Sequence, residues 1–146
     1  MASFGQWQYT CDRDATIAAY SRVAVGYTGS CNCNGCRNFV AARPKAFPPS
    51  FVALLSSLGV DPSKDAEIYH TARMSPGKHL YGGWFHFVGT LEVAGNFAPV
   101  QMEDGFTAWM CRSASACLAE LKGLPLVQVE ISATAVPWCL DEPEAE

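Results

Sequence analysis

Three of the seven cysteines in this chain lie in one short run, CNCNGC, that begins at Cys31. In a Cys-x2-Cys pair such as Cys33 and Cys36, the intervening turn brings both sulfurs to one metal ion at about 2.3 Å. Cys31 joins such a pair when the chain around it is not extended, because alternate residues of a regular strand lie too far apart to chelate tightly. Three thiolates leave a fourth tetrahedral position to water, a histidine, a carboxylate or another cysteine. The run therefore predicts a metal site, with zinc as the expected ion, held by Cys31, Cys33 and Cys36.

A thiol redox protein or sensor is the first alternative for the same cysteines. Cys36 is expected in the first turn of a helix beside Arg37, where the helix N-terminus and the cation would both lower the pKa of the thiol. Cys33 would then resolve an oxidised Cys36. The run lacks the aromatic-Cys-Gly-Pro-Cys context of a thioredoxin-like site. Free thiols without a chemical role are the second alternative, and the spacing alone leaves all three interpretations open.

The elements expected around the cysteines place them between a strand and a helix. Residues 16–27 are rich in β-branched and aromatic residues that partly alternate, which predicts a strand leading to the run. Asn34 is expected to cap a short helix over residues 35–43, and Pro44 is expected to end it. The cysteines would then lie on the loop and first helical turn that connect these two elements.

The rest of the chain predicts a second helix and an antiparallel sheet. This helix begins at the Pro-Pro-Ser segment 48–50 and ends before Gly59. The expected strands cover residues 66–74, 79–94, 106–112 and 126–133. The first two form a β-hairpin, and a short helix is expected over 114–122. These elements predict one α+β domain over residues 1–140, a mainly antiparallel sheet with two or three short helices packed on one face or end, and a disordered acidic tail over 141–146.

Two side chains on the long expected strand are candidates for a pocket near the cysteines. Alternation places Trp84 and His86 on one face of the strand and Phe85 and Phe87 on the opposite, core face. Neutral imidazole binds metals and titrates near pH 7, so His86 is a candidate fourth ligand or general base, with Trp84 beside it. A structural histidine that is only hydrogen-bonded is the alternative.

The remaining histidines and cysteines are expected to be structural. His70 and His79 lie on either side of the hairpin turn and are expected to face solvent. The other cysteines are most simply small core residues: Cys11, Cys111, Cys117 and Cys139. The sequence contains no Ser-His-Asp order, glycine-rich phosphate loop or His-Glu-x2-His segment, so it indicates neither a hydrolase nor a nucleotide-binding protein.

Composition narrows the classes of partner. Apolar residues make up 49% of the chain and charged residues 16%, which indicates a filled core and leaves apolar surface for a homodimer contact. The net charge is -4 and lysines and arginines do not cluster, so nucleic acid and anionic membranes are not expected partners. The first residues lack a secretion-signal pattern, and we expect a cytoplasmic protein with reduced thiols. No small-molecule ligand is indicated.

The segment Cys31 to Arg37 resembles the Cys-x-Cys-x2-Cys-Arg motif of the glutathione-dependent formaldehyde-activating family, zinc proteins of the carbon-sulfur lyase type. The resemblance implies zinc on Cys31, Cys33 and Cys36 and adds a third functional hypothesis, a carbon-sulfur lyase acting on glutathione adducts. That family also has paired cysteines upstream and downstream for a second zinc. This chain offers only single cysteines at those places.

A longer resemblance covers residues 30–140. The segments CNCNGCRNF, FPPSFVALLSSLGVDPSKDAEIY, YGGWFHFVG and VPWCL are similar to a bacterial protein family with a CxCxxCRNF motif and no assigned function. This likeness implies no chemistry of its own, and it disfavours the lyase. The sequence therefore predicts a small cytoplasmic protein with a zinc-binding cysteine loop.

Overall fold

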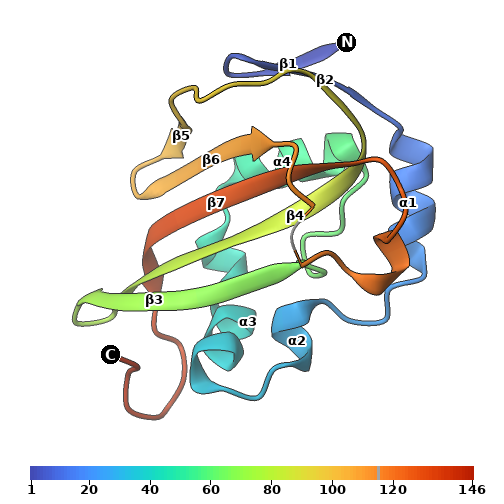
Figure 1. Ribbon diagram of the computed structural model, residues 1–146. Helices are drawn as coiled ribbons and strands as arrows, with labels where there is room; N and C mark the ends of the chain where they lie inside the picture. The colour runs from blue at the N-terminus through green and yellow to red at the C-terminus, as the bar shows by residue number, and fades with distance from the viewer. Residues whose placement is uncertain (115) are drawn as a thin grey trace.

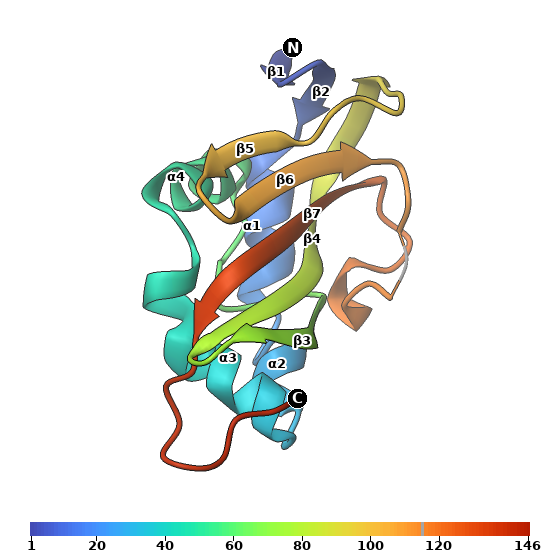
Figure 2. The same ribbon diagram turned by 90° about the vertical axis from the view of Figure 1, so that its left-hand side faces the viewer.

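The computed structural model describes residues 1–114 and 116–146 of the chain. Within them, seven strands form one sheet in the order β1-β2-β4-β7-β6-β5, with β3 paired to β4, and every pairing is antiparallel. Helices lie on one side of this sheet (Figures 1 and 2). The predicted α+β class with a mainly antiparallel sheet is confirmed.

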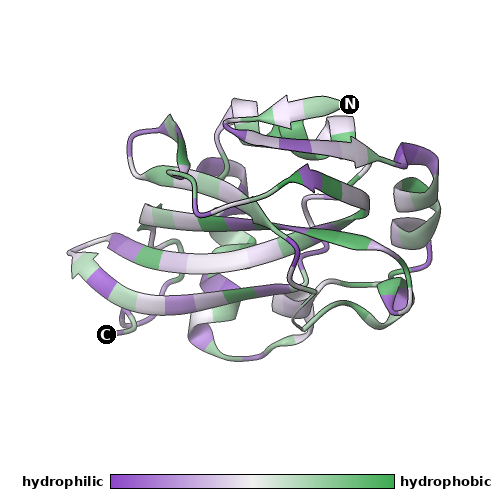
Figure 3. Ribbon diagram, turned by 45° about the horizontal axis from the view of Figure 1, so that its top comes forward, coloured by the Kyte–Doolittle hydropathy of each residue, from purple (hydrophilic) through white to green (hydrophobic). Residues whose placement is uncertain are grey.

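The central strand is β4, which pairs with β2 and β3 along one edge and with β7 along the other. The strands are β1 Ala2–Phe4, β2 Trp7–Cys11, β3 Glu67–Ser75, β4 Lys78–Val93, β5 Val100–Glu103, β6 Phe106–Cys111 and β7 Leu126–Pro137. The predicted hairpin is confirmed as β3 and β4, joined through Gly77, whose φ of 78° suits glycine. The alternation of polar and apolar residues along the strands can be followed in Figure 3.

Three strands, β1, β2 and β5, are missing from the sequence prediction. Each is short, with three to five residues, so its alternation covers only one or two repeats. The signal exists in β2, where Trp7 and Tyr9 are buried and Gln8 and Thr10 are exposed. A five-residue pattern is too short to separate a strand from a loop on sequence alone.

The helices bury their apolar faces against the sheet. They are α1 Arg13–Ser21, α2 Tyr27–Ser30, α3 Asn34–Ala46 and α4 Pro49–Leu58. A cluster of aromatic rings joins α3 and α4 to the sheet; its members are Phe39, Phe47, Phe51, Phe85 and Phe106. Helix α4 begins and ends as predicted, with Gly59 left-handed after it. In the part of the chain that the structure describes, no helix has the length and apolarity needed to cross a bilayer.

The strand predicted over residues 16–27 is wrong, because this segment contributes to helices α1 and α2. Asp12 caps α1 by accepting a hydrogen bond from the Ala15 N–H at 3.0 Å. One face of α1 is buried at helical spacing, namely Thr16, Ala19 and Tyr20. The apolar residues of this segment also partly alternate, and this alternation, which is typical of a strand, was followed in place of the 3.6-residue repeat of a helix.

Two further helix predictions need correction. Helix α3 starts one residue earlier than expected and continues past Pro44 to Ala46. Pro44 lies in the last turn, where its missing N–H removes a single intrahelical bond. In place of the helix predicted over 114–122, the described residues contain only a single 3-10 turn, Ala119–Leu121; residue 115 lies outside the described part.

Candidate metal centre

The three predicted ligands lie at the junction of α2 and α3. Cys31 directly follows α2, Cys33 is the N-cap of α3, and Cys36 lies in the first turn of α3. Only Asn32 separates Cys31 from the cap, so the two residues belong to a bend between helices and not to a strand. Cys31 and Cys33 nevertheless both have extended backbone dihedrals, so the expectation that the chain around Cys31 is not extended is wrong. The change of chain direction between the two helices, and not a compact backbone at Cys31, brings its sulfur to the Cys33-Cys36 pair.

The sulfur atoms of Cys31, Cys33 and Cys36 all lie within 4.8 Å of one another. The Cys31 and Cys33 sulfurs are 3.3 Å apart, and the Cys33 sulfur accepts a hydrogen bond from the Cys36 backbone N–H, also at 3.3 Å. Metal–sulfur bonds of 2.3 Å at tetrahedral angles separate sulfurs by about 3.8 Å. Shifts of about 1 Å or less would bring all three sulfurs to one ion.

Burial distinguishes the three thiols. Cys36 is buried, Cys31 is half-buried and Cys33 is exposed. Burial raises the pKa of Cys36 well above its ordinary value, and hydrogen bonds to its neighbours raise it further. Hydrogen bonds from Cys36 and Cys33 lower the pKa of Cys31. The expected low pKa of Cys36 is thus wrong, because burial raises it, and the pKa of Cys31 is lowered instead.

A buried carboxylate, Asp65, fixes the position of α2 and α3 relative to each other. It accepts hydrogen bonds from the Thr28 hydroxyl at 2.5 Å and the Thr28 N–H at 3.2 Å, and it pairs with Arg43 of α3 at 3.1 Å. Its carbonyl accepts from the Tyr27 N–H at 3.0 Å. Desolvation raises the pKa of Asp65, while the bonds from Thr28 and the Arg43 charge oppose that rise. Asp65 therefore holds the two helices whose junction carries the cysteines.

A second set of buried contacts fixes the first turn of α3. The Tyr81 hydroxyl donates to the Gly35 carbonyl at 2.7 Å and accepts from the Asn38 side chain at 3.2 Å. Asn38 also donates to the Pro137 carbonyl and accepts from the Cys139 N–H at 2.6 Å. The loop between Cys33 and Cys36 is thereby tied to β4 and to the end of β7.

Comparison of the chain with protein-family models, with curated proteins and with solved structures finds no match.

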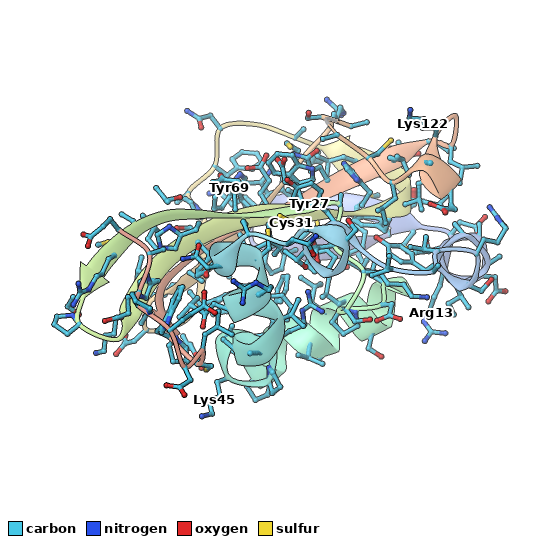
Figure 4. All side chains as sticks on the ribbon, turned by 90° about the horizontal axis from the view of Figure 1, so that it is seen from below. Arg13, Tyr27, Cys31, Lys45, Tyr69 and Lys122 are labelled. Carbon is cyan, nitrogen blue, oxygen red and sulfur yellow. The ribbon has the colours of Figure 1, made fainter. Side chains whose placement is uncertain are left out.

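Tyr27, in α2, lies beside the cysteine loop (Figure 4). Figure 4 shows Tyr27 and Cys31 close together beside the sheet, with Lys45 at the opposite end of α3. The charges of Cys31 and Cys36 raise the pKa of the exposed Tyr27 hydroxyl. A cavity of about 320 Å³ is lined by Tyr27, Glu67 and Cys117 among others. Ser30, which also lines this cavity, directly precedes Cys31 in the chain.

His86, the candidate fourth ligand, lies on strand β4 of the sheet and not at the junction of α2 and α3. It is fully buried, and its Nε2 is 2.9 Å from the Gln128 side-chain oxygen. Its Nδ1 has no hydrogen-bond partner among the residues described. The group of potential metal ligands contains the three cysteines and not His86. Trp84 is half-buried and contacts the Tyr69 ring, and Phe85 and Phe87 on the opposite face are buried as predicted.

His79 is buried, so the prediction that it faces solvent is wrong. Its Nδ1 lies 2.8 Å from Nε2 of the half-buried His70, and its Nε2 lies 2.8 Å from the Glu144 carboxylate. The Trp138 ring packs on it with centroids 4.9 Å apart. His70 in turn lies against Gly35, where an added Cβ would be 3.0 Å from the His70 Cβ. No sequence pattern predicts this series of contacts, because its members come from β3, β4 and the last residues of the chain.

The other four cysteines do not join the cluster. Cys11, Cys111 and Cys117 are half-buried, and Cys139 is exposed. The prediction that Cys139 is a core residue is therefore wrong. Cys117 lies outside any helix, whereas a helical position was expected. All seven cysteines lie in the described part of the chain and are free thiols.

Proposed function

We propose that this protein binds zinc through Cys31, Cys33 and Cys36, and that the ion stabilises the junction of α2 and α3. The observation that carries the proposal is the convergence of the three sulfurs within 4.8 Å. Soft thiolate ligands favour zinc, copper(I) or iron-sulfur centres over magnesium and calcium. Zinc is tetrahedral, so one position stays available for water or for a side chain outside the loop.

The support for the site also comes from the backbone around it. The Cys36 N–H already donates to the Cys33 sulfur, which would stabilise a thiolate there. Asp65 and Tyr81 hold both sides of the loop through buried hydrogen bonds. A loop held in this way loses little conformational freedom when an ion binds, which favours binding.

Metal analysis of purified protein tests the proposal. Freshly reduced wild type is expected to hold about one equivalent of zinc, and Cys33→Ser is expected to hold much less, because structural zinc binding depends on every thiolate. Cys139→Ser is the matched control, since it removes an exposed thiol outside the cluster. Less than about half an equivalent in wild type, or equal zinc in Cys33→Ser, would contradict the proposal.

A thiol redox function is the second candidate, and the 3.3 Å distance between the Cys31 and Cys33 sulfurs favours it. Here the Cys31 thiolate attacks a disulfide of an external oxidant such as oxidised glutathione, releasing one thiolate of that oxidant. The Cys33 thiolate then displaces the other, forming a disulfide within the loop. Mass spectrometry after oxidised glutathione treatment distinguishes the two functions. A loss of two hydrogens that zinc does not prevent would favour the redox function.

A further inference from the structure

The carboxy-terminal segment 138–146 turns back after β7 toward the elements that carry the cysteines (Figures 1 and 2). The sequence predicts disorder for residues 141–146, whereas two glutamates of this segment, Glu142 and Glu144, have named partners in the structure. The indole N–H of Trp138 donates to the Glu142 carbonyl at 3.0 Å, which folds the segment on itself. These contacts lead to the cysteine loop by two routes.

The first route passes through Arg37. The guanidinium Nη1 and Nη2 each donate to a carboxylate oxygen of Glu142 at 2.9 Å, forming a two-point pair. The Nε of the same side chain donates at 3.1 Å to the carbonyl of Asn32, the residue between Cys31 and Cys33. Because Glu142 fixes the plane of the guanidinium, it also fixes the donor that holds the Asn32 carbonyl.

The second route begins at Glu144. Its Oε1 accepts from the Gly77 N–H at 2.7 Å and lies 2.8 Å from the buried His79, while Oε2 is 3.3 Å from Arg73. An ionised carboxylate only accepts hydrogen bonds, so the His79 Nε2 donates to it. The opposite ring nitrogen of His79 contacts His70, which lies against Gly35. This route therefore reaches the turn between Cys33 and Cys36.

We propose that Glu142 and Glu144 make the carboxy-terminal segment a latch, whose docking and metal binding at the cysteine loop strengthen each other. The inference rests on the proposed zinc site. With the latch docked, the Asn32 carbonyl and the Gly35 turn are held before the ion arrives, so less ordering accompanies binding. By linkage, an ion that favours the ordered loop favours the docked latch by the same factor.

A competition titration of zinc against a chromophoric chelator tests the first direction of this coupling. The double variant with Glu142→Gln and Glu144→Gln is expected to bind zinc about tenfold more weakly than wild type, the scale of outer contacts that orient ligands. Asp141→Asn is the matched control. It also removes one negative charge from this segment, but the Asp141 carboxylate makes no hydrogen bond among the described residues. Its affinity is expected to stay within about twofold of wild type.

Hydrogen exchange of the wild-type protein tests the reverse direction without any variant of the latch. The reporters are the Trp138 indole N–H and the Arg73 amide, which donates to the Glu146 carbonyl at 3.2 Å. Zinc is expected to slow both exchange rates about fivefold or more. Cys33→Ser with the same zinc is expected to show no change.

The outcomes separate the latch from the metal site. If wild type takes up one zinc but the double variant binds it equally well and exchange at Trp138 does not respond, the latch is wrong and the metal site stands. If wild type takes up no zinc, both the site and the latch are overturned. Weaker zinc binding together with slowed exchange supports the latch.

Discussion

The cysteine cluster and the Asp65 cluster are adjacent but are built in opposite ways. The three cysteines come from one run of six residues, and two of them reach solvent. Asp65 is fully buried and gathers Thr28 from α2 and Arg43 from α3, with each carboxylate oxygen paired. The thiols that can react are thus close together in the sequence, whereas the residues that hold the two helices in place are far apart in the sequence. We therefore expect stability to depend on the Asp65 cluster and metal binding on the cysteines.

The largest loss of stability is expected for Asp65→Asn. The change leaves Arg43 with no carboxylate in a site where only 16% of its side chain is exposed. Removing the charge of one partner of a buried ion pair lowers the free energy of unfolding by about 3 kcal/mol. Chemical denaturation of reduced, metal-free protein measures this loss, with Asp141→Asn as the exposed control. A loss below about 1 kcal/mol would contradict the assigned role of Asp65.

A smaller loss is expected for Gly26→Ala at the start of α2. An added Cβ would lie 2.6 Å from the Lys64 Cα and 2.7 Å from the Asp65 N, so backbone must move. Overpacking of this kind costs about 2 kcal/mol. Gly29→Ala is the matched control, because its Cβ would overlap only the side chain of the exposed Val25, which can turn toward solvent without a movement of the backbone. Equal unfolding free energies of the two variants would show that the contact with Asp65 does not constrain α2.

Tyr81→Phe is expected to cost about 1.5 kcal/mol of unfolding free energy, because it removes two hydrogen bonds, one to the Gly35 carbonyl and one from the Asn38 side chain. The change removes the donor to the Gly35 carbonyl, so zinc affinity should fall as well as stability. Thermal unfolding and zinc titration measure the two effects, with the exposed Tyr69→Phe as the control. A stability loss with unchanged zinc affinity would separate this contact from the site.

The smallest loss of stability is expected for Cys33→Ser in the metal-free protein. Cys33 is exposed, and surface changes alter the unfolding free energy by about 0.5 kcal/mol or less. Zinc uptake should nevertheless be lost. Denaturation in the presence of a chelator measures the first quantity. A destabilisation as large as that of Asp65→Asn would remove the contrast between the two clusters.

The convergence of the three cysteines could be predicted because short sequence separation itself limits how far apart the sulfurs can lie. The hairpin and α4 could be predicted for the same reason, because short segments specify them. A Pro-Gly turn specifies the hairpin, and a Pro-Pro start with a glycine after the last turn specifies α4. The residues that surround the cysteine loop in space could not be predicted. His79 and Glu144 are 65 residues apart, and no short pattern in the sequence shows that they pair.

The spacing of apolar residues also did not predict the correct element where it fits both a strand and a helix. The residues of α1 partly alternate and also place small and aromatic side chains at helical spacing, and the tertiary contact with β4 selects the helix. His86 shows a similar limit. Alternation gave its face correctly, but burial of that face by the rest of the chain is not encoded in strand 78–93 itself.

The sulfur that caps α3 has a practical consequence. Because the Cys33 sulfur accepts the Cys36 N–H, a single atom both terminates a helix and is a proposed zinc ligand. Electron withdrawal from that sulfur by an ion would alter the hydrogen bond and therefore the magnetic environment of the amide proton. The Cys36 cross-peak in a nitrogen-proton spectrum should then give a direct gauge of the fraction of molecules carrying metal, with no external probe.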